Sequence, residues 1–238
     1  MTPEKQLDLR LRQMNIALNE KQLKQFVTYY NMVVEKNKVM NLTAITAYED
    51  FIDKHFADSL AIIGFIDFSK ISAMMDVGTG AGFPGIPLKI VDQDLKVTLL
   101  DSLNKRIRFL GEVSEVLELQ DVTMIHGRAE DFAHQSAYRE KYDLCVSRAV
   151  ANLSTLSEYC LPFVKVGGMF AAYKSGDYSE ELEKAKKAIS LLGGEIADIH
   201  SFSLPGTEIE RSIIIIRKRK ETGKKYPRKA GMPSKEPL

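Results

Sequence analysis

The chain has 238 residues, of which 45% are hydrophobic and 27% are charged, and its net charge is +1. This composition is ordinary for a soluble globular protein and allows a sizeable core. No apolar run reaches the roughly 18 residues that a membrane span needs, and the polar first residues do not resemble a signal peptide. Cys145 and Cys160 match no metal-ligand spacing. We therefore expect a cytoplasmic protein without a metal site.

The charges are distributed unevenly along the chain. Residues 217–238 contain nine Lys or Arg and two Glu, a net of +7, so the other 216 residues carry 24 basic and 30 acidic side chains, a net of −6. An acidic body with a basic tail indicates a polyanionic partner that is contacted from one end. The alternative is a solvated tail that keeps the protein soluble.

The first part of the chain, to about residue 70, has the periodicity of helices. Leu7, Leu11 and Met14 recur at helical spacing, and apolar residues between 23 and 34 do so again. The break between the two segments, at residues 19–20, predicts two packed helices. A further helical stretch contains Lys54-His55 and Asp58-Ser59.

Short apolar runs alternate with amphipathic segments in the next part of the chain. This alternation favours a parallel sheet that is covered by helices on both faces. The last two strand-like runs are joined by Pro205-Gly206-Thr207, which is too short for a helical crossover, so we expect them to be antiparallel. The fold class is therefore α/β, a mostly parallel sheet with a C-terminal antiparallel hairpin. The predicted strands are 73–77, 97–100, 122–125, 144–146, 169–172, 195–204 and 210–216, and the predicted helices between them are 86–91, 105–119, 153–161 and 179–192.

A glycine-rich loop follows the first predicted strand and leads into a helix. Two patterns overlap there: Gly80-x-Gly82-x-x-Gly85 meets the dinucleotide fingerprint, and Asp76-x-Gly78-x-Gly80-x-Gly82 resembles the first motif of class I methyltransferases. Glycines in such a loop permit positive φ and a close approach of a ligand to the backbone. The alternative is a tight turn that holds no ligand.

Asp101 ends the second predicted strand, where a carboxylate can accept hydrogen bonds from both hydroxyls of a ribose. Its distance from the loop fits either a dinucleotide or S-adenosylmethionine. The closing hairpin resembles the methyltransferase sheet, and Pro84 leaves one fewer N–H for a pyrophosphate. We therefore expect S-adenosylmethionine as the cofactor.

Two further strand ends carry candidate site residues. Ala129 and Glu130 follow the third strand, where methyltransferases contact adenine, although Glu130 and Asp131 could simply favour a helix start. Arg148 ends the fourth strand and could bind guanine O6, an RNA phosphate or the cofactor carboxylate. A structural ion pair is the alternative for Arg148.

The residues after the fourth strand restrict the chemistry. The Asn/Asp-Pro-Pro-aromatic motif of exocyclic-amine methylation is absent, and neither Cys145 nor Cys160 has the Pro or Thr neighbour typical of a cytosine C5 nucleophile. Guanine N7 has an in-plane lone pair and no proton, so its methylation needs alignment rather than a general base. A methyltransferase for another RNA base or a small molecule, an RNA-binding protein with a degenerate pocket, and a dinucleotide oxidoreductase remain as alternatives.

Several segments together resemble one family, the bacterial guanine-N7 methyltransferases of small-subunit ribosomal RNA, also called glucose-inhibited division protein B. They span almost the whole chain in the expected order. The matching segments are Asn37-x-x-x-Asn41-Leu42-Thr43, Lys54-His55-x-x-Asp58-Ser59, Asp76 to Leu88, Asp101-Ser102-x-x-Lys105-Arg106, Arg128-Ala129-Glu130, Ser147-Arg148-Ala149-Val150-Ala151, and Lys225-Tyr226-Pro227-Arg228-Lys229-x-Gly231-x-Pro233.

The resemblance implies a helical cap (1–70) on a class I, Rossmann-like methyltransferase domain (71–217) with a basic tail (218–238). It also implies methylation of guanine N7 in the 530 loop of 16S RNA, either free or in a small subunit or assembly intermediate, by a protein that we expect to be a monomer. Arg148 is the expected catalytic residue. The expected cofactor-binding residues are Asp76, Gly78, Gly80, Gly82, Phe83, Asp101, Ala129, Glu130 and Arg148, and the expected RNA-binding residues are Lys54, His55, Lys224, Lys225, Tyr226, Arg228 and Lys229.

One departure from the family concerns the cap. The family often has tryptophan where this chain has Lys36, and the chain contains no tryptophan. The change affects how the cap packs and leaves the cofactor residues untouched. In the tail, Tyr226 lies among basic residues and could stack on an unpaired base, which favours RNA contact over a solvated tail.

Overall fold

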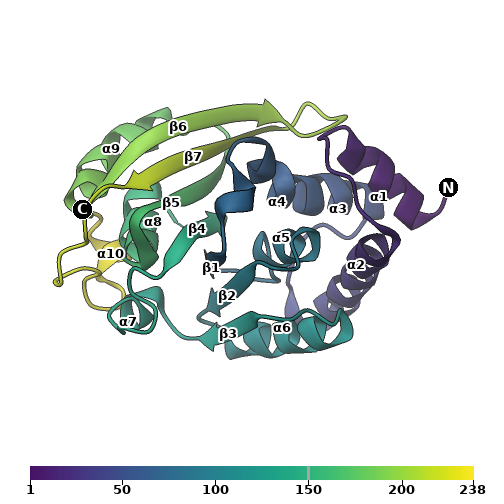
Figure 1. The fold of residues 1–238 in the computed structure, drawn as a ribbon, viewed down its shortest axis with the longest axis horizontal. Helices are drawn as coiled ribbons and strands as arrows, with labels where there is room; N and C mark the ends of the chain where they lie inside the picture. The colour runs from purple at the N-terminus through teal and green to yellow at the C-terminus, as the bar shows by residue number, and fades with distance from the viewer. Residues whose placement is uncertain (149–150) are drawn as a thin grey trace.

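The computed structural model of the chain describes residues 1–148 and 151–238. One seven-stranded sheet forms the centre, with helices on both of its faces (Figure 1). The strands are β1 (Ala73–Val77), β2 (Lys96–Asp101), β3 (Val122–His126), β4 (Tyr142–Arg148), β5 (Val164–Ser175), β6 (Gly194–Ser203) and β7 (Glu210–Lys218). The helices of the domain are α5 (Gly85–Val91), α6 (Asn104–Val116), α7 (Ala129–Phe132), α8 (Leu153–Cys160) and α9 (Ser179–Leu191), with a short α10 (Met232–Lys235) in the tail.

The strand order is β3-β2-β1-β4-β5-β7-β6. The first five strands are parallel, and β7 runs antiparallel to both β5 and β6. This confirms the predicted sheet and its closing hairpin. β5 is longer than predicted because its first half contains Lys165 and the pair Gly167-Gly168, which interrupt the apolar pattern.

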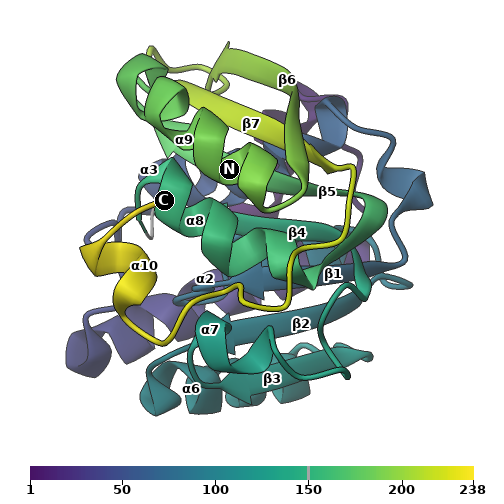
Figure 2. The same cartoon turned by 90° about the vertical axis from the view of Figure 1, so that its left-hand side faces the viewer.

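The two faces of the sheet are covered by different parts of the chain. Helices α5 and α6, together with the N-terminal helices, cover one face, and α7, α8, α9 and α10 lie on the other (Figures 1 and 2). Buried apolar side chains accordingly form two clusters, one on each side of the sheet. None of the helices in the described part of the chain is long and apolar enough to cross a membrane.

The cap consists of α1 (Pro3–Arg12), α2 (Glu20–Met40) and a third helical segment. This segment runs from α3 (Tyr48–Phe51) through a π-helical turn (Ile52–Ala57) into α4 (Asp58–Leu60), and two 3₁₀ turns (Ala61–Gly64 and Phe68–Lys70) lead to β1. Helix α2 begins at a capping box formed by Asn19 and Gln22. The predicted break between the first two helices is therefore confirmed.

The Asn37-x-x-x-Asn41-Leu42-Thr43 motif ends helix α2. Asn41 has a left-handed conformation (φ 50°) that stops the helix. The Asn37 side chain accepts hydrogen bonds from the backbone N–H groups of Leu42 (2.6 Å) and Thr43 (2.9 Å) and donates one to the Thr43 carbonyl (2.8 Å). The motif thus fixes Thr43 at the edge of the cap.

Lys36 joins the cap to helix α6, which packs on the sheet. Its Nζ lies 2.7 Å from Oε2 of Glu112 on α6 and 5.8 Å from the centroid of the Phe109 ring. The lysine stem and ammonium group therefore make both an apolar and an ionic contact with α6 at this position.

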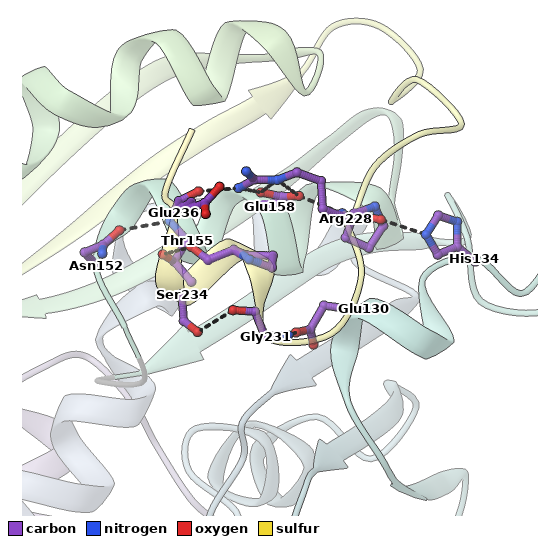
Figure 3. A network of polar contacts seen from close by, with 11 residues as sticks. Glu130, His134, Asn152, Thr155, Glu158, Arg228, Gly231, Ser234 and Glu236 are labelled. Carbon is purple, nitrogen blue, oxygen red and sulfur yellow. Dashed lines mark hydrogen bonds and ion pairs between the residues drawn. The ribbon is translucent and has the colours of Figure 1, made fainter.

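The basic tail is folded against the body, which corrects the alternative of a solvated tail. It crosses α7 and α8, and Figure 3 shows the polar contacts that hold it. Arg228 makes a bidentate pair with the fully buried Glu158, with Nη2–Oε2 2.7 Å and Nε–Oε1 3.0 Å. Thr155 Oγ1 donates to the Pro233 carbonyl (2.9 Å), and His134 contacts the Pro227 carbonyl (2.7 Å).

Candidate active site

The loop after β1 is shaped by Asp76, which lies beneath it. Asp76 is fully buried, and its Oδ2 accepts hydrogen bonds from Thr79 Oγ1 (2.7 Å) and from the Gly85 N–H (2.9 Å). Burial raises the pKa of Asp76 to about 7. Its Oδ1 has no hydrogen-bond partner among the described residues. Asp76 therefore holds the loop in shape, and its predicted contact with the cofactor stays a prediction.

The glycines of the loop serve different purposes. At Gly82 (φ +107°) a Cβ would lie 2.6 Å from the Tyr29 hydroxyl and 2.7 Å from Ile86 Cγ1, so the cap can pack there only against glycine. At Gly80 a Cβ would meet only the Gly78 carbonyl, at 4.0 Å. Gly80 consequently leaves open space for a ligand, whereas Gly82 is used for internal packing.

Two adjoining cavities lie at the carboxyl ends of the parallel strands, where α/β proteins bind ligands. The first, of about 180 Å³, is bordered by the ends of β1, β2 and β3 and by α8. The second, of about 450 Å³, lies between the glycine loop and the cap. Both are lined by Gly78, Asp101 and Ser102. Together they form a two-part cleft, and Asp101 lies where the two parts meet.

Asp101 is nearly buried, and three N–H groups already use its carboxylate. Oδ1 accepts from the Leu103 N–H (2.9 Å), and Oδ2 accepts from the Gly80 N–H (2.9 Å) and from Arg106 Nη1 (3.2 Å). Only Arg106 contributes a mobile side chain, which is about one-third exposed. A ribose hydroxyl could therefore replace the Arg106 contact without disturbing the loop.

The first cavity suits an aromatic base. Leu100 and Ala129 supply apolar walls, and Glu130 and Tyr159 supply polar groups. Glu130 is buried, and its Oε1 accepts a hydrogen bond from the Gly231 N–H of the tail (2.8 Å), as Figure 3 shows. The tail therefore positions one wall of this cavity.

Arg148 stands at the junction of the cap and the sheet. Its Nη1 donates to the Lys54 carbonyl (3.1 Å) and to Asp58 Oδ2 (3.0 Å), and its Nη2 lies 3.0 Å from His55 Nδ1. The guanidinium also lies 5.0 Å from the centroid of the Phe83 ring. Arg148 thus forms the structural ion pair that was the alternative reading and also lines the second cavity, and its predicted binding role stays a prediction.

His55 is held in one tautomer by these contacts. Arg148 can only donate, so Nδ1 of His55 must accept, and Nε2 carries the proton toward Thr43 Oγ1 at 2.8 Å. Burial and the Arg148 charge lower the pKa of His55 to about 3. The ring stacks on Phe83 with centroids 4.5 Å apart and planes 9° apart. His55 is therefore a neutral, fixed part of the wall.

A third cavity, of about 240 Å³, begins on the other side of Arg148. Arg148 and His55 line both this cavity and the second one. The other polar residues of its lining are Lys54, Asp58, Tyr173, Lys174, Ser175 and Arg211. Asp58 is 4% exposed, and Nε of Arg211 lies 3.4 Å from its Oδ1. The cavity beside the glycine loop thus adjoins a space that the cap and the end of β5 build together.

The predicted RNA-binding residues fall into three groups. Lys54 and His55 lie at the third cavity, with Lys54 Nζ 2.6 Å from Asp50 Oδ1. Lys224, Lys225 and Lys229 are exposed on the tail. In contrast, Tyr226 is buried and Arg228 is paired with Glu158. In this conformation Tyr226 cannot stack on a base, which corrects that expectation.

Sequence reasoning missed some residues of the site. Tyr29 donates to the Ala81 carbonyl (2.7 Å) and packs against Phe83, and Tyr159 reaches the first cavity from α8. Both lie on helices whose periodicity indicates only core packing, so no local pattern could identify them. Of the Ser147–Ala151 motif, Ala149 and Val150 lie outside the described residues. No group of side chains suited to a metal occurs among the residues described.

Comparisons with known proteins identify one family over most of the chain. The model of a family described as GidB, rRNA small subunit methyltransferase G, matches residues 22–214. The ribosomal RNA small subunit methyltransferase G of Lachnoclostridium phytofermentans is 54% identical over 228 residues, which is 96% of this chain and 94% of that protein. The protein of the same name from Bacillus pumilus is 52% identical over 233 residues, 98% of each chain.

Solved structures resemble the fold at low sequence identity. A putative O-methyltransferase from Klebsiella pneumoniae is 15% identical with a TM-score of 0.56, and the match covers 90% of this chain and 96% of that one. TrmN from Thermus thermophilus is 13% identical with a TM-score of 0.51 and covers 70% of this chain and 53% of that one. These matches extend to the fold alone.

Proposed function

The chain belongs to the rRNA small subunit methyltransferase G family, and we propose that it transfers a methyl group from S-adenosylmethionine to N7 of a guanine in the 530 loop of 16S ribosomal RNA. The observation that carries this proposal is the row of three adjoining cavities from the glycine loop to the cap, with Arg148 and His55 lining both the second and the third. A cofactor and an acceptor base can approach each other there from opposite sides.

The residues along the cleft fit S-adenosylmethionine. We assign the adenine to the cavity lined by Ala129 and Glu130. The ribose is assigned to Asp101, where the two cavities meet, and the methionine to the space beside Gly80 and Phe83. When bound, the cofactor supplies a methyl group on a sulfonium sulfur, and its C–S bond breaks as the N7 lone pair forms the new C–N bond. No diphosphate has to be accommodated, in agreement with Pro84 at the start of α5.

The protein's own residues supply alignment in this reaction. N7 carries no proton, so neutral His55 is not required as a base. Its ring and Phe83 instead form a flat stacked wall that orients the reacting groups. The Arg148 guanidinium is held by the Lys54 carbonyl, Asp58 and His55. It is therefore fixed before the substrate arrives and loses little freedom when it binds.

The experiment that tests the proposal is transfer of labelled methyl groups from S-adenosylmethionine to small-subunit RNA, and to small subunits that lack the modification. Borohydride–aniline treatment breaks RNA at N7-methylguanosine, so it maps the product. We expect cleavage at one guanine of the 530 loop. Label in another base or at another site would contradict the proposed acceptor, and binding of cofactor without label in any RNA would contradict the proposed substrate.

A further inference from the structure

The third cavity contains a carboxylate that the proposed methyl transfer does not use. Asp58 lines this cavity and is 4% exposed. Its Oδ2 pairs with Arg148, but its Oδ1 has no hydrogen-bond partner among the described residues, Arg211 Nε being 3.4 Å away. A buried acceptor without a hydrogen bond is costly. The ion pair with Arg211 offsets part of this cost, and because Asp58 lines a cavity, its Oδ1 can still accept a hydrogen bond from a ligand there.

Arg148, which lines the same cavity, has N–H groups that make no hydrogen bond to the described residues. A guanidinium has five N–H groups, and hydrogen bonds to Lys54, Asp58 and His55 occupy three of them. Within the described part of the chain, the other two have no hydrogen-bond partner. A fixed donor and a fixed acceptor, whose paired atoms are 3.0 Å apart, therefore line the third cavity together.

A donor on Arg148 beside an acceptor on Asp58 is complementary to the edge of guanine. Along the ring edge from N7, guanine presents the O6 acceptor and then the N1–H and N2–H₂ donors. Adenine presents the N6–H₂ donor and then the N1 acceptor, which is the reverse. Arg148 lines both the second cavity, to which we assign the methionine of the cofactor, and the third cavity, whereas Asp58 lines only the third. A guanine in the third cavity with its N7 directed toward the second cavity would consequently place O6 near Arg148 and N1 near Asp58.

We propose that Asp58 and Arg148 select the acceptor base, Arg148 by donating to O6 and Asp58 by accepting hydrogen bonds from N1–H and N2–H₂ of guanine. This inference rests on the proposed guanine-N7 reaction and names the residues that impose it. Adenine would place donor against donor and acceptor against acceptor, which leaves buried polar groups unpaired. Asp58 belongs to the cap and Arg148 ends strand β4, so the specificity would come from the junction of the cap and the sheet.

The same contact would also favour the reaction. Guanine acquires positive charge as N7 forms its new bond, and N1–H becomes more acidic. The hydrogen bond to the Asp58 carboxylate therefore strengthens on the way to the transition state. An interaction of this kind affects kcat more than KM. A purely structural role for Asp58, as a support for Arg148, would give no dependence on the functional groups of the base.

The test combines a protein variant with a base analogue. Small-subunit RNA is assembled by ligation with guanine or inosine at the mapped methylation site, because inosine lacks only the 2-amino group. For the wild-type protein we expect kcat/KM to be about tenfold lower on inosine, the effect of one hydrogen bond to a charged group. For Asp58→Asn we expect kcat on guanine to fall at least about tenfold, with the two bases now nearly equal and the calorimetric Kd of S-adenosylmethionine unchanged.

Asp53→Asn is the matched control. Asp53 is also a buried aspartate of the same helical segment, but it pairs with Arg10 (3.0 Å) and lies away from the cavities of the cleft. We expect this variant to keep the wild-type preference for guanine over inosine.

Three results would overturn the proposal. The first is an equal kcat/KM of the wild-type protein on guanine and inosine, a result that does not depend on the folding of any variant. The second is an Asp58→Asn protein that keeps the wild-type preference for guanine. The third is a loss of S-adenosylmethionine affinity in that variant. Failure of the proposed function gives a different result, since the wild-type protein would then form no borohydride-sensitive N7-methylguanosine.

Discussion

At the scale of single residues, the neutral state of His55 has a measurable consequence. Its Nδ1 faces a guanidinium that can only donate, and its pKa is lowered from 6.5 to about 3 by burial and by Arg148. The His55 imidazole therefore binds a proton below about pH 6.5 in the unfolded chain, but only below about pH 3 in the folded chain. The stability that His55 contributes is complete above the unfolded pKa and falls as the pH is lowered through that window.

We expect His55→Gln to destabilise the protein less at acid pH than at neutral pH. Between about pH 7.5 and about pH 5.5 the wild-type protein should lose about 1.4 kcal/mol that the variant does not lose, because only the wild-type protein has this imidazole. Urea unfolding of both proteins at the two pH values measures the difference. A penalty that is equal at both values would show that His55 titrates normally in the fold.

At the scale of secondary structure, the tail acts as a strap that closes one wall of the cleft. Arg228 reaches the fully buried Glu158, and Gly231 donates to Glu130 at the first cavity (Figure 3). Removing one partner of a buried ion pair leaves the other charged group without compensation, which is strongly destabilising. The Arg228–Glu158 pair therefore holds the segment that positions Glu130.

We expect Arg228→Gln to destabilise the protein by about 2–3 kcal/mol, less than a fully buried pair would cost because Arg228 is partly exposed. The tail should become sensitive to trypsin at Lys224 and Lys225, and the affinity for S-adenosylmethionine should fall severalfold. Unfolding, limited proteolysis and calorimetry measure the three effects. Lys235→Gln removes an exposed charge from the same tail and should change none of them. Equal behaviour of the two variants would show that the strap has no such role.

The strands, the main helices and their order could be predicted from the sequence because each has its own apolar period and is bounded by turn residues. The contacts within the tail could not. Its composition, rich in lysine and proline, indicates an exposed segment, and Glu158, which neutralises Arg228, lies 70 positions away in the chain. Long-range ion pairs of this kind leave no local pattern.

The candidate site divides in the same way. Gly80, Asp101, Ala129 and Arg148 were predicted because parallel strands bring their carboxyl ends to one edge of the sheet, and all four line the cleft. The motif containing Asp76 was recognised, but the sequence could not indicate that this carboxylate lies under the loop. That depends on its fit against Thr79 and Gly85, a property of packing rather than of spacing.

At the scale of the whole molecule, the separation of charge remains after folding, but fewer cations are free than the sequence suggests. Lys218 is buried beside Glu140, Arg219 pairs with Glu195, and Arg228 pairs with Glu158. Lys224, Lys225 and Lys229 stay exposed. Lys220 and Lys235 are exposed as well, but Lys224, Lys225 and Lys229 form the densest cluster of exposed cations in the tail, and we expect this cluster to attract a polyanion.

We expect the triple variant Lys224→Gln, Lys225→Gln, Lys229→Gln to bind small-subunit RNA more weakly and with a smaller dependence on salt. If each lysine neutralises one phosphate, the slope of log Kobs against log[salt] should decrease by about 2. This variant is preferable to truncation, because deleting the tail would also remove the strap. An unchanged slope would place the RNA contacts elsewhere.

The adjacency of the three cavities defines the shape of a single inhibitor. A purine tethered to an adenosyl thioether could occupy all three at once, with its linker passing beside the hydrogen-bonded pair of His55 and Arg148, which lines both the second and the third cavity. Joining the two halves means that the second half binds at a high effective concentration, so the tethered compound should bind more tightly than either half. The adenosyl half would provide affinity for a common type of cofactor site. Selectivity would come from the purine half, because the cap and the end of β5 together build the space that it enters.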